Sequence, residues 1–71
     1  MKGFEVLLTS SPDREKLVSE IWFTDNMVAE IYQERDQFEI ILYPNLKRTF
    51  NLDDFLEILK IGKTKLIDNQ N

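Results

Sequence analysis

The sequence contains no cysteine and no histidine. Their absence excludes disulfide bonds, thiolate nucleophiles and imidazole bases, and it removes the commonest side-chain ligands of transition metals. A serine nucleophile would have only a lysine to activate it. We therefore expect a non-enzymatic protein that uses no cofactor and no metal. The lack of cysteine also fits a reducing, cytoplasmic location.

Glycine and long hydrophobic runs are scarce as well. The two glycines, Gly3 and Gly62, are too far apart in the chain to form a loop that cradles a phosphate group. The apolar run at residues 6–8 is too short for the core of a signal peptide, and no run approaches the length of a membrane span. These features predict a soluble protein that does not enter a membrane.

Basic residues are also fewer than acidic residues. The chain has 13 acidic and 9 basic residues, for a net charge of −4. Residues 1–45 hold nine of the acidic and four of the basic residues, so the excess of negative charge lies in the first part of the chain. Nucleic-acid binding usually needs a basic patch that releases counterions, so we expect no direct binding of DNA or RNA. A partner protein with a basic surface remains compatible with this charge.

A chain of 71 residues predicts one small domain, residues 1–71, with a marginal core. A domain of this size buries only about 60% of the surface that its unfolded chain exposes. Residues 68–71 carry no large apolar side chain and are expected to fray. Because the core is marginal, any large apolar surface left uncovered is a candidate binding site.

Residues 51–67 predict a C-terminal helix. Asn51 is a favourable N-cap residue, and Phe50 and Phe55 have the spacing of a hydrophobic staple at the first turn. Apolar residues recur at steps of three and four, which indicates one buried stripe. Gly62 lies on that stripe and indicates either a close approach of the helix to a sheet or an early helix end near Ile61. We favour the helix that continues to Ile67.

The residues before this helix predict strands. Residues 4–9 and 38–43 alternate between apolar and polar side chains, as half-buried strands do. Residues 12–22 fit either a helix, which gives a βαββα order, or a second strand. The segment 18–22 is echoed ten residues later by the segment 28–32, which favours similar roles for the two segments. We therefore predict an α+β domain in which a four-stranded antiparallel meander is followed by one helix (ββββα).

In this meander the side chains divide between two faces. The face against the helix is predicted to hold Phe4, Val6, Leu8, Leu17, Ile21, Phe23, Ala29, Ile31, Phe38, Ile40 and Leu42. The opposite face is predicted to hold Glu5, Leu7, Thr9, Val18, Glu20, Trp22, Val28, Glu30, Tyr32, Glu39, Ile41 and Tyr43. This division requires an odd loop between the second and third strands, such as residues 25–27, because an even loop would mix the faces.

The second face is unusual because it carries aromatic, aliphatic and acidic side chains together. Outer faces of antiparallel sheets are usually polar, and Trp and Tyr are enriched in binding hot spots. The candidate partner-binding residues are Leu7, Glu20, Trp22, Glu30, Tyr32, Glu39, Ile41 and Tyr43. The opposing interpretation is that the aromatic residues serve only cross-strand packing.

We therefore expect a small acidic protein-binding module of bacterial or phage type. It would engage a basic partner in the manner of an immunity protein, an antitoxin or another protein inhibitor. The alternative is a structural module that covers the same face with a second copy of itself. An enzyme or hard-metal site built from Glu20, Glu30 and Glu39 is the least favoured interpretation, because a chain of this size hardly allows a deep cleft.

Overall fold

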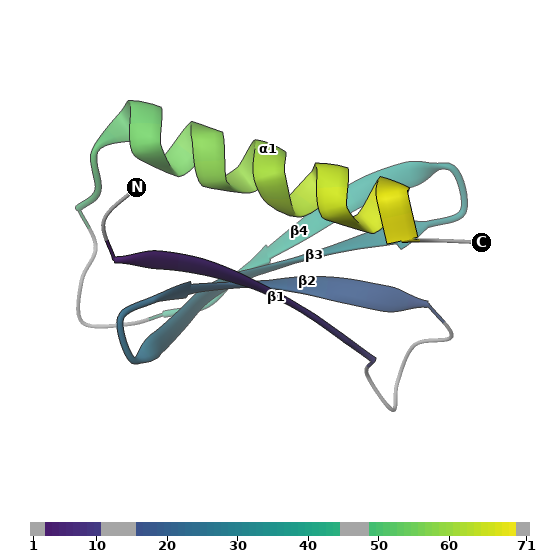
Figure 1. Cartoon of the computed structure of the whole chain (residues 1–71), viewed down its shortest axis with the longest axis horizontal. Helices are drawn as coiled ribbons and strands as arrows, with labels where there is room; N and C mark the ends of the chain where they lie inside the picture. The colour runs from purple at the N-terminus through teal and green to yellow at the C-terminus, as the bar shows by residue number, and fades with distance from the viewer. Residues whose placement is uncertain (1–2, 11–15, 45–48, 70–71) are drawn as a thin grey trace.

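In the computed structural model the chain folds into one antiparallel sheet and one helix (Figure 1). The structure describes residues 3–10, 16–44 and 49–69. The elements are β1 (Phe4–Ser10), β2 (Leu17–Phe23), β3 (Asn26–Glu34), β4 (Gln37–Leu42) and α1 (Leu52–Asn69). The predicted ββββα order is confirmed.

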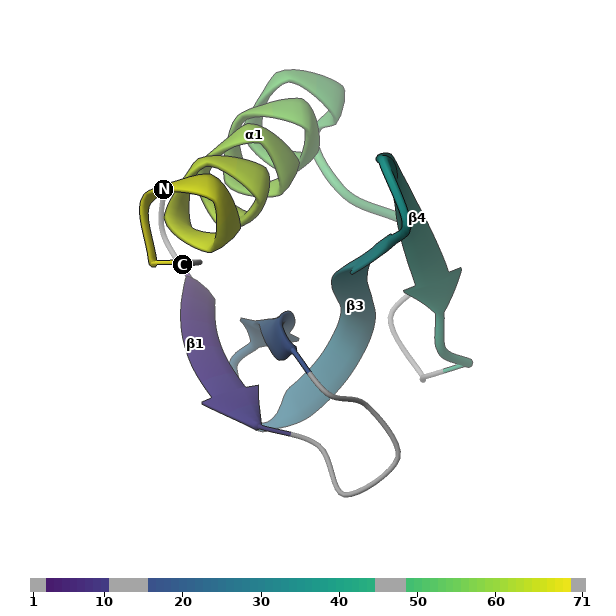
Figure 2. The ribbon, with the colours of Figure 1, turned by 90° about the vertical axis from the view of Figure 1, so that its right-hand side faces the viewer.

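The sheet is a simple meander, with the strands in the order β1-β2-β3-β4 and each neighbour antiparallel. The helix α1 lies across one face of this twisted sheet, and the other face carries no element of secondary structure in the described part of the chain (Figures 1 and 2). The alternative that placed a helix over residues 12–22 is wrong for residues 17–22, which are strand, while residues 11–15 lie outside the described ranges.

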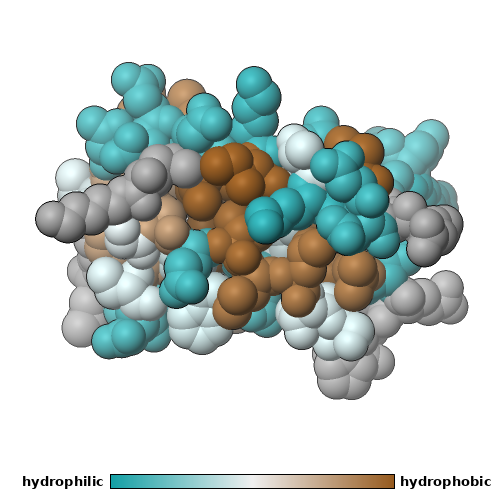
Figure 3. Space-filling model, in the orientation of Figure 1, coloured by the Kyte–Doolittle hydropathy of each residue, from teal (hydrophilic) through white to brown (hydrophobic). Residues whose placement is uncertain are grey.

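The core lies between the sheet and α1. Its most buried apolar side chains include Ile21, Ala29 and Ile31 from the sheet and Ile58 and Leu66 from the helix. In the space-filling view of Figure 3, hydrophobic side chains form a band across the middle of the molecule, along the line where α1 meets β1. The helix side of β1 therefore packs under α1, as the alternation of its side chains predicts.

The start of the helix is fixed by the predicted cap. The side-chain Oδ1 of Asn51 accepts a hydrogen bond of 3.0 Å from the backbone N–H of Asp54. The rings of Phe50 and Phe55 stack with their centroids 5.4 Å apart, which is the predicted staple. The helix then runs two residues beyond the predicted end at Ile67, to Asn69.

Gly62 marks a close approach of α1 to the sheet and not a helix end. A Cβ atom at Gly62 would lie 3.0 Å from the Cδ1 of Ile21 and 3.1 Å from the Cδ1 of Ile31. The hydroxyl of Ser19, which is fully buried, donates a 2.7 Å hydrogen bond to the carbonyl of Gly62. Helix and sheet are therefore joined at this point by a polar bond as well as by apolar packing.

The expectation of an odd loop between the second and third strands is wrong. The turn consists of two residues, Thr24 and Asp25, and it pairs Phe23 with Asn26. The faces still agree, because the register shifts by one residue further along the pair, where Val28 is the additional residue. By inserting one residue, this β-bulge returns the side chains of β3 to the faces that a three-residue loop would have given them.

The last strand departs most from the predicted core. Ile40 and Leu42 point toward the helix side of the sheet, as predicted, but they are 43% and 65% exposed. Their exposure arises because α1 packs chiefly over β1 and β2, at the other end of the strand order. The helix thus leaves part of β4 uncovered.

Candidate protein-binding face

All eight candidate partner-binding residues lie on the side of the sheet opposite α1. We call them together the aromatic–acidic face: Leu7, Glu20, Trp22, Glu30, Tyr32, Glu39, Ile41 and Tyr43. The register of the strands establishes this grouping, because directly opposed residues in a sheet point to the same face. Each of the four strands, with the residue that follows β4, contributes at least one of them.

A single row of the sheet contains half of these residues. Leu7 is opposite Glu20, Glu20 is opposite Glu30, and Glu30 is opposite Ile41. The two glutamates are half-buried, and like charges directly opposite one another destabilise a strand pair. The centre of the face therefore holds a concentrated negative charge flanked by apolar side chains.

Aromatic donors hold both of these central carboxylates. The indole Nε1 of Trp22 donates a 3.0 Å hydrogen bond to Oε1 of Glu20. The hydroxyl of Tyr43 donates a 2.9 Å hydrogen bond to Oε1 of Glu30. Hydrogen bonds to an ionised carboxylate are stronger than those between neutral groups, so these pairs fix the position of both the rings and the charges.

A third pair of the same kind lies nearer the β3–β4 turn. The hydroxyl of Tyr32 donates a 2.8 Å hydrogen bond to Oε1 of Glu39, the residue directly opposite it on β4. Glu39 is exposed, whereas Tyr32 is half-buried. Each aromatic residue of the face is thus coupled to one glutamate, and the coupling reaches from β2 to β4.

The aromatic–acidic face is partly packed and partly open. Val18 and Val28 point to this side of the sheet but are only 1% and 3% exposed. Leu7, in contrast, is 47% exposed, and the nearby Glu5 is exposed as well. The face therefore combines buried apolar side chains with acidic and aromatic groups that are at least partly accessible to solvent.

Sequence reasoning missed the pairing of each aromatic residue with its own glutamate. The echo of Glu20 and Trp22 by Glu30 and Tyr32 gave a partial signal. In β2 the glutamate does bond the aromatic residue two positions along the strand. In β3 it bonds Tyr43 instead, because β4 brings that hydroxyl within reach.

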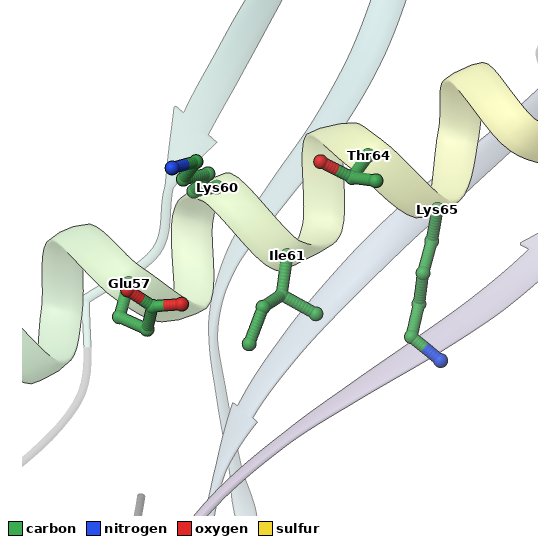
Figure 4. Close-up of a pocket in the computed structure, with 5 residues that line it drawn as sticks. All are labelled: Glu57, Lys60, Ile61, Thr64 and Lys65. Carbon is green, nitrogen blue, oxygen red and sulfur yellow. The ribbon is translucent and has the colours of Figure 1, made fainter.

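A shallow depression on the outer side of α1 is separate from this face (Figure 4). It has a volume of about 210 Å³ and is lined by Glu57, Lys60, Ile61, Thr64 and Lys65, all from one helix. No group of three or more acidic side chains among the described residues is arranged to hold a metal ion. The described part of the chain also has no helix that is long and apolar enough to cross a membrane.

The chain matches no protein-family model, no curated protein and no solved structure.

Proposed function

We propose that this chain is a non-enzymatic module that binds a basic protein through the aromatic–acidic face, in the manner of an immunity protein, an antitoxin or another protein inhibitor. The observation that carries the proposal is the direct opposition of Glu20 and Glu30 on a sheet face that no described helix or strand covers.

The opposed carboxylates favour a basic partner. Like charges directly opposite one another disfavour the pairing of two strands. A lysine or arginine side chain from a partner, placed between Glu20 and Glu30, turns this repulsion into two attractions. Complementary charge of this kind also speeds encounter and rejects partners of the wrong sign. The net charge of −4 acts in the same direction.

The aromatic residues favour a protein over a small ligand. Trp22 lies on β2, Tyr32 on β3 and Tyr43 directly after β4, and all three are half-buried with their polar atoms hydrogen-bonded. Rings held in this way lose little conformational freedom on binding and present large contact areas. A broad surface of anchored rings suits another protein surface.

The direct test is capture of a partner by the immobilised protein from an extract of its source cells, quantified by mass spectrometry. The informative variant carries both Glu20→Gln and Glu30→Gln, which keep the size of the side chains and remove two charges. Its matched control carries Glu57→Gln and Asp68→Asn, which remove two charges from exposed positions of α1. We expect a basic protein to bind the wild type and the control and to be lost from the face variant.

A second variant tests the rings. Trp22→Ala combined with Tyr32→Ala should abolish capture, and circular dichroism should confirm that the variant remains folded. Recovery of the same protein by the charge variant and the ring variant at wild-type levels would refute the proposal. The proposal would also be refuted if the α1 control lost the captured protein as completely as the face variant does.

A further inference from the structure

The outer edge of β4 has backbone groups with no strand beside them in the described part of the chain. The backbone N–H of Tyr43 donates a 2.9 Å hydrogen bond to the carbonyl of Val28 on β3. Because bonded and non-bonded pairs alternate in an antiparallel ladder, the odd-numbered residues of β4 also direct their backbone groups to β3. The N–H and C=O groups of Phe38, Ile40 and Leu42 therefore point away from the sheet.

The side chains at the same edge are apolar and open to solvent. Ile40 and Leu42 point to the helix side of the sheet, where α1 does not cover them. The Nζ of Lys63 lies 5.0 Å from the ring centroid of Phe38, so this flank of α1 faces β4. Leu52 and Leu56 are on the same flank, by the spacing of side chains on a helix, and are 68% and 54% exposed.

We call Ile40, Leu42, Leu52 and Leu56 the open apolar strip. Sheet edges in monomeric proteins are usually protected by lysine, proline, a bulge or an inward-pointing charge. Within Gln37–Leu42 β4 has none of these, because its one charged residue, Glu39, lies on the opposite face, and Pro44 comes two residues after the end of the strand. The β1 edge differs, since its helix-side residues pack against the core under α1. The β4 edge therefore has the properties of a strand that pairs with another strand.

We propose that β4 pairs in antiparallel fashion with β4 of a second copy of the chain, around a two-fold axis, to form one eight-stranded sheet. The outward backbone groups belong to the even-numbered residues, so the hydrogen-bonded pairs across the axis are Ile40 with Ile40, and Phe38 with Leu42, of the second copy. This register places apolar side chains opposite apolar side chains on the helix side.

The sequence of β4 is compatible with its own antiparallel pairing, which identifies a second copy as the occupant. In the same register Glu39 is opposite Ile41 of the second copy, and no glutamate is directly opposite another. A two-fold interface must be complementary to itself, and the sequence of β4 meets this condition about Ile40. Pairing also brings Ile40 and Leu42 of each copy beside the same residues of the other copy, and it joins the two aromatic–acidic faces into one continuous surface. The inference does not depend on what that surface binds.

A single cysteine tests the register, because the native chain has none. In a hydrogen-bonded antiparallel pair the Cα atoms are about 5.5 Å apart, which a disulfide can bridge. Under mild oxidation we expect Ile40→Cys to form a disulfide-linked dimer. The control Leu7→Cys has a similar native exposure, 47% against 43%, but lies on the other face, on β1, and should not form a disulfide-linked dimer. Equal or faster cross-linking of Leu7→Cys would overturn the proposal.

A charge exchange tests the same contact without oxidation. Ile40→Lys and Ile40→Glu should each raise the dissociation constant of the dimer at least about 100-fold, since like charges then meet at the axis. Mixing the two variants should restore a dimer, because residue 40 faces itself. Circular dichroism should remain unchanged, since the native side chain is 43% exposed. A wild type that is monomeric in light scattering at all concentrations, or an Ile40→Lys variant that still dimerises, would overturn the proposal.

Discussion

Replacing Gly62 by alanine should destabilise the protein, although alanine is the better helix former. In a helix interior the change from Gly to Ala contributes about 1 kcal/mol of stability. Here the new Cβ atom would lie 3.0 Å from the Cδ1 of Ile21 and 3.1 Å from the Cδ1 of Ile31. These distances are well below the optimal carbon–carbon separation of about 3.5–4.0 Å, so the neighbours or the helix must move.

The magnitude follows from how little room these neighbours have. Ile21 and Ile31 are 0% and 6% exposed, so neither can turn away without disturbing the core. Overpacking of a core costs about 1–3 kcal/mol, and a helix that lifts also stretches the Ser19 hydrogen bond, whose net contribution is about 1 kcal/mol. Against the gain in helix propensity, we expect Gly62→Ala to lower the free energy of unfolding by about 1–2 kcal/mol.

Urea unfolding monitored by circular dichroism measures this change. Thr64→Ala, at an exposed position of the same helix, is the control and should stabilise the protein by a few tenths of a kcal/mol, since alanine has the higher helix propensity. Ile21→Val removes the Cδ1 atom that the new Cβ would meet, so Gly62→Ala should cost less in that background. If Gly62→Ala stabilises the wild type by the full propensity gain, the close approach of α1 to the sheet is refuted.

Three other substitutions test separate parts of the structure in the same assay. Glu20→Gln should be more favourable to stability, by about 0.2–1 kcal/mol, in the wild type than in a Glu30→Gln background, because both weaken the Trp22 hydrogen bond alike but only the first removes an opposed charge. Equal effects in the two backgrounds would contradict the repulsion. Asn51→Ala removes the helix cap and should lower the free energy of unfolding by about 1 kcal/mol, and an unchanged value would mean that the cap does not stabilise the protein. Arg35 has a positive φ of 60°. Arg35→Gly should therefore stabilise the turn by up to about 1 kcal/mol, and a fall in stability would argue against backbone strain there.

The order of elements and the start of the helix were predictable because their causes are local. Alternation of side chains identified the strands, and Asn51 with Phe50 and Phe55 identified the first turn of α1. Gly62 was recognised as an exception on a buried stripe. The bond from Ser19 to Gly62 was not predicted, because it depends on which strand the helix crosses, and that is a tertiary property.

The candidate face was predictable as a set of residues but not as an arrangement. Its membership follows from alternation, whereas the opposition of Glu20 and Glu30 depends on a register that a β-bulge adjusts. The exposure of Ile40 and Leu42 was missed for a related reason. Alternation gives the face to which a side chain points, but it does not give the width of sheet that one helix can cover.

The proposed binding of a basic protein to the aromatic–acidic face can be observed directly at Trp22. Trp22 is the only tryptophan, so its indole N–H gives one identifiable signal in a ¹H–¹⁵N correlation spectrum, and it is hydrogen-bonded to Glu20. The decisive measurement is a titration of the labelled protein with the basic protein recovered by capture. We expect the indole signal and the amides of β2 and β3 to shift together, while those of the exposed side of α1 stay in place. Shifts confined to α1, with an unmoved indole signal, would contradict binding at the aromatic–acidic face.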